Sequence, residues 1–313
     1  MKKVSYDHYG GVGVLEMIDA PMPEPAGTQL LIQVKAVAIN PLDWKIMAGT
    51  MKLMSGSKFP KGIGIDFSGV VKQVGKGTVH FRPGDAVFGA VDPFKGGALA
   101  EYLLVAERDV ARKPENISFE QAAALPTGGT AALQIFDRLA TLAPGTKVLI
   151  NGASGGIGMF AIQIAKRKGA HVTGVASTNS LAWVKRWGSD VVLDYRKEDV
   201  VQRGVQYDVV LDLSGKLPYR AAKKIMKPDS VYVNSIPGPR EIVGSFVHNL
   251  FSKQKYQVLL LKQTQAHLET LSAYAAASME ILIGASFPMA SFRQAYAEAS
   301  AGGIAGKAVF TVG

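Results

Sequence analysis

Cysteine is absent from the 313 residues, and this absence excludes several classes of chemistry. Without cysteine the chain forms no disulfide, thiolate nucleophile, iron–sulfur cluster or thiolate zinc site. Histidine is also scarce, and the five histidines show neither the spacing of metal ligands nor that of a catalytic triad. We therefore expect no bound metal.

Long apolar runs are also rare. One uncharged run, residues 148–165, reaches the length of a membrane span but contains Asn151, Ser154, Gln163 and four glycines, which are poorly suited to lipid. The first residues, MKKVSYDHYGGVG, lack the apolar centre of a signal peptide. We expect no integral membrane segment and a cytoplasmic protein.

Basic residues outnumber acidic ones, and the formal net charge is +10. The excess is scattered in ones and twos, and a longer cluster, Lys166-Arg167-Lys168, ends a predicted helix, where cations complement the helix dipole. No zinc-finger or RNP-like signature is present. These observations predict a solvated basic surface and no nucleic-acid partner.

The hydrophobic rhythm changes along the chain. Up to about residue 115 the sequence contains short β-branched segments between Gly and Pro turns, which predicts a β-rich domain. From about residue 118, helical and strand patterns alternate, which indicates a parallel sheet covered by helices on both faces. The predicted fold class is thus α/β, with a β-rich domain at 1–116, a domain with a doubly wound parallel sheet at 117–280 and a return to the first domain at 281–313.

A glycine-rich turn follows the predicted strand at 147–151. Residues 152–158, GASGGIG, match the dinucleotide-binding pattern with alanine in its first place, and an apolar-faced helix comes next. The alternative is a glycine-rich turn that binds no nucleotide. The strand before the turn, the helix after it and a second strand at the right distance favour nucleotide binding. The predicted phosphate-binding residues are Ser154, Gly155, Gly156, Ile157 and Gly158.

The end of the next strand indicates which nucleotide binds. NAD enzymes usually carry an acidic residue about 20 residues after the motif, but Thr178 stands 20 residues after Gly158. Because the neighbouring sequence offers hydroxyls and an amide without a carboxylate, we expect NADP (NADPH); the same residues can also cap the following helix. The predicted pocket comprises Ser177, Thr178, Asn179, Tyr195 as a flat partner for adenine, and Lys185 or Arg196 as the cation.

Ordered blocks over nearly the whole chain resemble the zinc-free quinone oxidoreductase branch of the medium-chain dehydrogenase/reductase superfamily. The blocks are AINPLDWKIMAG (38–49), GIDFSGVVKQVG (64–75), RPGDAVFG (82–89), GGALAEYLLV (96–105), AAALPTGGTAALQ (122–134) and GKAVFTV (306–312). NPLDWK, SIPGP (235–239) and KQKYQVLLL (253–261) are most similar to plant envelope quinone oxidoreductase homologues and to alkenal and ketone oxidoreductases. The resemblance implies a GroES-like catalytic domain beside the Rossmann domain, with the active cleft between them.

The resemblance also implies the chemistry. Zinc-dependent relatives place a cysteine where Asn40 or Pro41 falls and a His-Glu pair near Ile65-Asp66, and both are missing here. Quinones and α,β-unsaturated carbonyls accept hydride without a Lewis acid, because the arriving charge is delocalised onto oxygen. We therefore expect zinc-independent, NADPH-dependent hydride transfer to a quinone or an enal or enone.

By the same likeness, Lys45 and Asn40 are the candidate catalytic residues. Lys45 would donate to the developing enolate oxygen and contact the cofactor, and Asn40 would face the nicotinamide. From the residues alone, Lys45 can equally be a solvated surface group and Asn40 a helix cap. Other branches often carry tyrosine at the Lys45 position, so this chain departs from that pattern. The remaining candidates for contact with the cofactor are Thr127, which can also cap a helix, Ile236, Pro237 and Lys307.

Two other functions remain open from the sequence. A nucleotide-binding redox sensor or structural protein would bind NADP(H) without turnover, and an enoyl thioester reductase would act on acyl thioesters. The apolar strand at 256–261 lies at a plausible sheet edge, so the sequence leaves a homodimer and a monomer open.

Overall fold

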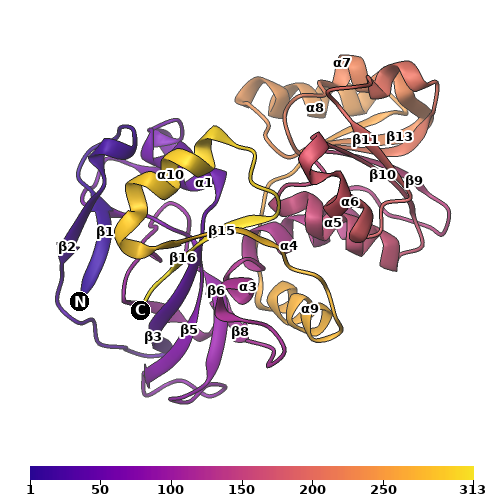
Figure 1. Cartoon of the computed structure of the whole chain (residues 1–313). Helices are drawn as coiled ribbons and strands as arrows, with labels where there is room; N and C mark the ends of the chain where they lie inside the picture. Colours follow the sequence, from indigo (N-terminus) through magenta and orange to yellow (C-terminus); the bar gives the residue numbers. More distant parts are fainter. The chain divides into compact units, whose positions relative to one another are not determined.

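The computed structural model describes residues 1–313 except for the side chain of Pro239, and these residues form two compact units (Figure 1). Unit 1 comprises Met1–Thr127 and Gln263–Gly313, and unit 2 comprises Gly128–Lys262. The sequence placed the boundaries after residues 116 and 280 instead. They differ because α3 (Phe119–Ala123) packs on the sheet of unit 1, and α9 (Gln265–Ala276) packs on a strand of that sheet.

Unit 1 is built around one long strand, β3 (Gln29–Ala38), which is buried along most of its length. It pairs with β5 (Asp66–Val74), β7 (Tyr102–Ala106) and β16 (Lys307–Thr311), so the last strand of the chain lies beside an early one (Figure 1). The other strands of this seven-stranded sheet are β6 (Ala86–Ala90), β8 (Val110–Arg112) and β15 (Ile283–Pro288). A smaller sheet contains β1 (Lys2–Tyr6), β2 (Glu16–Asp19) and β4 (Lys61–Gly62).

Short helices connect the strands of unit 1. Proline at the first helical position and a capping box begin α1 (Pro41–Met47), which buries Ile46 and Met47. Besides α3 and α9, unit 1 contains α2 (Lys52–Ser55) and α10 (Phe292–Ala301), with 3-10 turns at Val12–Val14, Glu107–Asp109 and Met289–Ser291. The buried faces of these elements meet in one core that includes Phe67, Phe310 and Tyr296.

Unit 2 is a six-stranded parallel sheet in the order β11-β10-β9-β12-β13-β14. The strands are β9 (Lys147–Asn151), β10 (His171–Ala176), β11 (Val191–Asp194), β12 (Tyr207–Asp212), β13 (Met226–Asn234) and β14 (Lys255–Val258). The order reverses between β9 and β12, where doubly wound sheets bind nucleotides. The predicted fold class, a β-rich domain plus a doubly wound parallel sheet, is confirmed.

Helices connect the parallel strands of unit 2. They are α4 (Pro126–Gln134), which begins in unit 1, α5 (Gly156–Arg167), α6 (Leu181–Arg186), α7 (Tyr219–Ala222) and α8 (Pro239–Phe251). The sequence predicted a single helix over 129–140, but a π-helical turn at Ile135–Leu139 follows α4. Shorter 3-10 turns lie at Thr178–Ser180, Val200–Arg203 and Lys223–Ile225.

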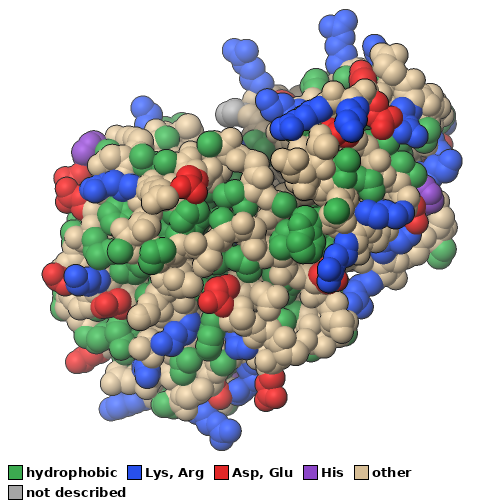
Figure 2. Space-filling model, viewed as in Figure 1, with side chains coloured by type: hydrophobic (Ala, Val, Ile, Leu, Met, Phe, Trp, Pro, Cys, Tyr) green, Lys and Arg blue, Asp and Glu red, His purple; other side chains and the backbone are tan. Residues whose placement is uncertain are grey.

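The surface carries cations and anions together. Figure 2 shows Lys and Arg side chains interspersed with Asp and Glu over the face in view, as expected for a solvated basic surface. Among the described residues, no helix is both long enough and apolar enough to cross a membrane.

Candidate functional site

The glycine turn of unit 2 lies between β9 and α5, in the strand–turn–helix context that the motif predicts. Its first glycine, Gly152, has φ +87°, a conformation that L side chains rarely adopt. Gly155 is the N-cap of α5 and provides no side-chain hydrogen bond. Because the first amides of a helix have no partner within it, the N–H groups of Gly156, Ile157 and Gly158 can hold phosphate oxygens.

Two glycines of the motif differ in the space around them. A Cβ atom added to Gly158 would lie 2.5 Å from the carbonyl oxygen of Ala153 and 2.6 Å from that of Gly152. A Cβ added to Gly155 would meet only the Gly152 oxygen, at 3.5 Å. Glycine is therefore required at 158 for helix packing, whereas at 155 the fold itself tolerates a side chain.

A buried carboxylate supports the turn, and sequence reasoning missed it. Asp212 Oδ1 accepts from Asn151 Nδ2 at 3.0 Å and from the Ser214 N–H at 3.2 Å. Asp212 ends β12 in register with Asn151, which ends β9. The sequence signal that could have indicated this contact is a polar residue at the end of each of two predicted strands, Asn151 and Asp212.

The predicted pocket at the end of β10 contains a carboxylate, which the sequence analysis did not expect. The Thr178 hydroxyl donates to Asp194 Oδ2 at 2.6 Å, and the Arg196 N–H donates to Asp194 Oδ1 at 3.0 Å. These two hydrogen bonds hold the pKa of Asp194 below its usual value. The expectation of no carboxylate was wrong, because parallel pairing places Asp194 of β11 beside Ala176 at the end of β10.

The other residues of the predicted pocket differ in whether their side chains are already hydrogen-bonded within the protein. Tyr195 is 58% exposed, and its N–H donates to the Ala176 carbonyl at 3.2 Å, beside the strand end. Arg196 lies next to the Tyr195 ring, and its guanidinium makes no hydrogen bond or ion pair with a described residue. Lys185 instead donates to the Asp190 carbonyl. Arg196 is therefore the available cation of the two, and Asn179 is exposed beside it in sequence. The half-buried Ser177 shares a hydrogen bond of 3.3 Å with the Ser180 hydroxyl.

After β13 the chain turns outward at Ile236 and Pro237, the predicted neighbours of the nicotinamide. Ile236 is 42% exposed, and its N–H donates to Asn234 Oδ1 at 2.8 Å. The backbone of this segment is thus fixed by a side chain at the end of β13.

In unit 1, Lys45 lies in the last turn of α1 and is half-buried. Within the described part of the chain, its ammonium has no hydrogen bond, ion pair or counter-ion. Burial lowers its pKa from the ordinary value of lysine. A half-buried cation without a partner can donate strongly to an oxygen on which negative charge develops.

Asn40, the second candidate catalytic residue, is turned inward. Its Oδ1 accepts from Lys307 Nζ at 2.6 Å, and its Nδ2 donates to Asp66 Oδ2 at 3.0 Å. Asn40 is 3% exposed and Lys307 is 5% exposed. Neither side chain therefore presents a free group at the surface of unit 1.

Thr127 is held by the same carboxylate. Its hydroxyl donates to Asp66 Oδ1 at 2.6 Å, and its N–H donates to Asp66 Oδ2 at 3.1 Å. Asp66 is completely buried, and burial raises its pKa while the Lys307 charge and the Thr127 hydroxyl oppose that rise. Asp66 therefore fixes the beginning of α4.

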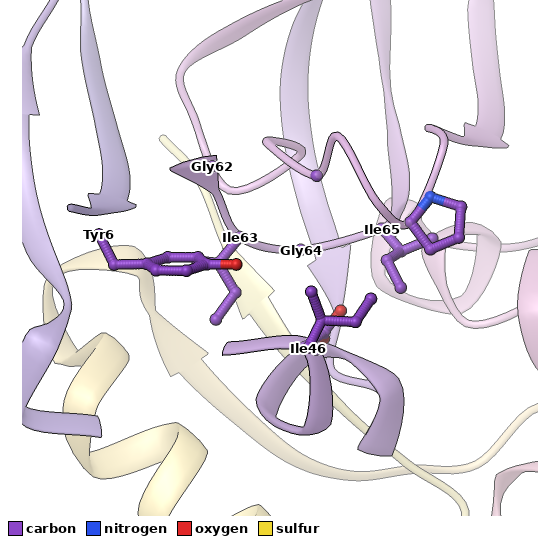
Figure 3. A pocket seen from close by; sticks show the side chains of 9 residues that line it. Tyr6, Ile46, Gly62, Ile63, Gly64 and Ile65 are labelled. Carbon is purple, nitrogen blue, oxygen red and sulfur yellow. The ribbon is translucent and has the colours of Figure 1, made fainter. Parts of the chain in front are cut away.

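A small cavity of unit 1 lies beside Asp43, a residue that sequence reasoning did not single out. Tyr6, Ile46 and Ile63 line it, and the Tyr6 ring points toward both isoleucines (Figure 3). Asp43 Oδ2 accepts from the Asn40 N–H at 2.9 Å, but the buried Oδ1 has no partner among the described residues. Burial raises the pKa of Asp43 to about 7. The sequence signal was its place three residues after Asn40 in a capping box.

This carboxyl gives the stability of the protein a pH dependence. Unfolded Asp43 would lose its proton near pH 4, whereas the folded form keeps it up to about pH 7. The contribution of Asp43 to the free energy of unfolding should therefore decrease as the pH rises from 4 to 7, by a few kcal/mol at most. In urea unfolding, we expect the free energy of unfolding to fall less between pH 5 and 8 in Asp43→Asn than in the wild type. Equal decreases in both proteins would contradict a raised pKa of Asp43.

Among the described residues, no group of three or more His, Cys, Asp or Glu side chains is arranged to hold a metal ion. The candidate functional groups of unit 2 are those of the dinucleotide turn. Those of unit 1 are the Lys45 ammonium, which has no partner among the described residues, and the buried cluster of Asn40, Asp66 and Lys307.

Comparisons with known proteins agree with this architecture. The model of the alcohol dehydrogenase GroES-like domain matches residues 26–115, and that of zinc-binding dehydrogenases matches residues 187–310. Quinone-oxidoreductase QR1 of Triphysaria versicolor is 30% identical over 321 residues, which cover 99% of this chain and 98% of its own. The 2-methylene-furan-3-one reductase of Solanum lycopersicum is 37% identical over 258 residues, covering 78% of this chain and 66% of its own.

A solved structure extends the likeness to three dimensions. The quinone oxidoreductase of Coxiella burnetii superposes with a TM-score of 0.92 at 31% identity, covering 100% of this chain and 99% of its own. Near-complete coverage in sequence and in structure confirms the predicted resemblance. The chain is an oxidoreductase of the medium-chain dehydrogenase/reductase superfamily and belongs to its quinone oxidoreductase-like branch.

Proposed function

We propose that the protein is a zinc-independent, NADPH-dependent oxidoreductase that reduces quinones or α,β-unsaturated carbonyls. The observation that carries the proposal is the half-buried Lys45 ammonium, which has no partner among the described residues. An enone or quinone that receives hydride develops negative charge on oxygen, and a fixed cation stabilises that charge without a metal. The names of the relatives, a quinone oxidoreductase and an enone reductase, support the same acceptors.

The residues present fit a nicotinamide dinucleotide. The uncapped amides at the start of α5 would hold its phosphates, and Tyr195 would lie against the adenine. When bound, the reduced cofactor supplies a hydride. Lys45 would donate a hydrogen bond to the acceptor oxygen and would stabilise the negative charge that collects there until a proton from solvent neutralises it.

Turnover of defined acceptors tests this function. NADPH oxidation is measured with quinones, enals, enones and enoyl thioesters, and NADPH binding is measured by calorimetry. We expect binding and turnover with quinones or enones. Binding without any turnover would indicate a redox sensor, and activity confined to thioesters would indicate an enoyl reductase; either result would overturn the proposal.

We propose that Arg196 favours NADPH over NADH by pairing with the 2′-phosphate. The Thr178 hydroxyl already donates to Asp194, whereas the Arg196 guanidinium has no hydrogen bond among the described residues. Arg196→Ala should weaken NADPH binding about tenfold and change NADH binding little, since only one nucleotide carries the phosphate. Lys224→Ala is the control, because it removes a positive charge from an exposed position of unit 2 outside this pocket. Equal losses of NADPH affinity in both variants would refute a specific role for Arg196.

We also propose that the protein is a homodimer. One of the two edge strands of the sheet is β14, and one face of α8 next to it exposes large apolar side chains by 55–87%. These side chains are Val243, Phe246, Val247, Leu250 and Phe251. An open strand edge beside an apolar helix face suits two-fold pairing with a second copy. Light scattering should give the mass of two chains, and the mass of one chain would refute the dimer.

A further inference from the structure

Asn40 occupies the link between β3 and α1 and is held from three sides. Its N–H donates to Asp43 of α1, its Oδ1 accepts from Lys307 of β16, and its Nδ2 donates to Asp66 of β5. Because the amide oxygen and nitrogen face a cation and a carboxylate respectively, the orientation of the side chain is determined. The residue immediately before α1 is thus fixed to two strands of the sheet.

Lys307 and Asp66 extend this attachment in both directions. Lys307 Nζ also donates to the Ile39 carbonyl at 3.1 Å, so it holds two successive residues before α1. Asp66 receives both the hydroxyl and the N–H of Thr127 at the beginning of α4. One buried network, Lys307–Asn40–Asp66, therefore fixes the starts of two helices.

The short length of α1 makes this attachment important for Lys45. A helix of seven residues has little stability of its own, so its position depends on its caps and on packing. Lys45 lies in its last turn, and the ammonium has no partner among the described residues that would hold it in place. The direction of the helix, set at Asn40, is therefore a principal constraint on where the Lys45 ammonium lies.

We propose that Lys307, Asn40 and Asp66 form a positioning network that aligns Lys45 for hydride transfer. This inference rests on the proposed function. It makes Lys307 and Asn40 positioning residues that act through α1, in place of the cofactor and substrate contacts that the sequence analysis expected.

The charges of the network account for a lysine at position 307. Asp66 is fully buried, and an ionised carboxylate in such a place requires a compensating cation. Lys307 provides this positive charge, and the Asn40 side chain lies between the two groups, hydrogen-bonded to both. Burial lowers the pKa of Lys307, and the negative charges of Asp66 and Asp43 oppose that change. Removing Lys307 alone leaves Asp66 uncompensated, whereas removing both charges restores the balance but not the donor to Asn40.

The test compares Lys307→Met with the double variant Lys307→Met/Asp66→Asn. We expect Lys307→Met to lower kcat about tenfold or more, with the dissociation constant of NADPH changed less than about twofold, because the phosphates bind in unit 2. Hydrogen exchange at the amides of α1 should become faster. In the double variant the melting temperature should recover, but kcat should remain low because Asn40 Oδ1 still lacks its donor.

Lys113→Met is the matched control. Lys113 is also partly buried and donates to backbone carbonyls, those of Pro114 and Ile117, but it lies outside the network. We expect its kcat and α1 exchange to match those of the wild type. Recovery of kcat in the double variant would show that Lys307 only balances charge, and unchanged kcat and α1 exchange in Lys307→Met would show that it positions nothing; each result would overturn the inference.

A further variant separates misfolding from loss of position. Should Lys307→Met not fold, Lys307→Gln keeps an amide that can donate to Ile39 and Asn40, and it should restore slow exchange in α1. Failure of Lys307→Gln to slow that exchange would overturn the inference. Because exchange does not depend on turnover, it tests the network even if the wild type reduces no acceptor, a result that would refute the proposed function alone.

Discussion

Replacing Lys45 with methionine is expected to lower kcat for quinone or enone reduction by about 10²–10³-fold, the usual effect of removing one donor to a developing oxyanion. Methionine preserves the length and apolar stem of the side chain but removes the charge. Because Lys45 has no partner among the described residues, its removal leaves no carboxylate unpaired, and the melting temperature should hardly change. The dissociation constant of NADPH should stay within about threefold of the wild-type value, since this interaction strengthens in the transition state.

Lys52→Met, which alters an exposed lysine at the start of α2, is the control for Lys45→Met and should leave kcat unchanged. Burial lowers the pKa of Lys45, so the wild-type rate should fall as the pH rises through that pKa and the donor is lost. The methionine variant should lack this decline. If kcat survives in Lys45→Met, Lys45 has no part in the mechanism.

Gly155→Ala is expected to weaken NADPH binding about 10–100-fold without unfolding the protein. The backbone at Gly155 has φ −81° and ψ 176°, which alanine adopts readily, and the new Cβ would meet only the Gly152 oxygen at 3.5 Å. The added methyl group instead occupies space that the phosphates need for close approach to the backbone. Calorimetry with NADPH, together with a thermal melt, measures both quantities.

Gly158→Ala provides the contrast for this experiment. Its Cβ would lie 2.5 Å from the Ala153 oxygen, so either the turn or α5 must shift and the melting temperature should fall. A normal melt with weak binding in Gly155→Ala, and a lowered melt in Gly158→Ala, would separate phosphate contact from helix packing. Unchanged affinity in Gly155→Ala would remove the turn at 152–158 from cofactor binding.

The local parts of the site were predictable because their signals are local. The glycine spacing of 152–158 between an apolar strand and an apolar-faced helix fixes the backbone course over a few residues, and the structure has the strand, turn and helix in those places. Alternation of helix and strand likewise predicted the parallel sheet of unit 2. The domain boundaries were less predictable, because the packing of α3 and α9 on the sheet of unit 1 depends on contacts distant in sequence.

The polar partners could not be predicted, because they depend on strand register. Thr178 and Asp194 are 16 residues apart and meet only because β10 and β11 pair in parallel. Sequence reasoning followed the chain beyond β10 and therefore missed the carboxylate on the neighbouring strand. The same limitation hid Asp212 beside Asn151.

The sequence by itself determined the alternating elements, the dinucleotide turn and the place of Lys45 in a short capped helix, since each depends on residues within a few positions of one another. Only the tertiary structure decided that Lys307 bonds Asn40, 267 residues away, and that both are buried. A lysine or an asparagine can serve equally as a ligand contact or as an internal support. Which role it has depends on the groups that the completed fold places around it, because a buried polar atom must find its partner there.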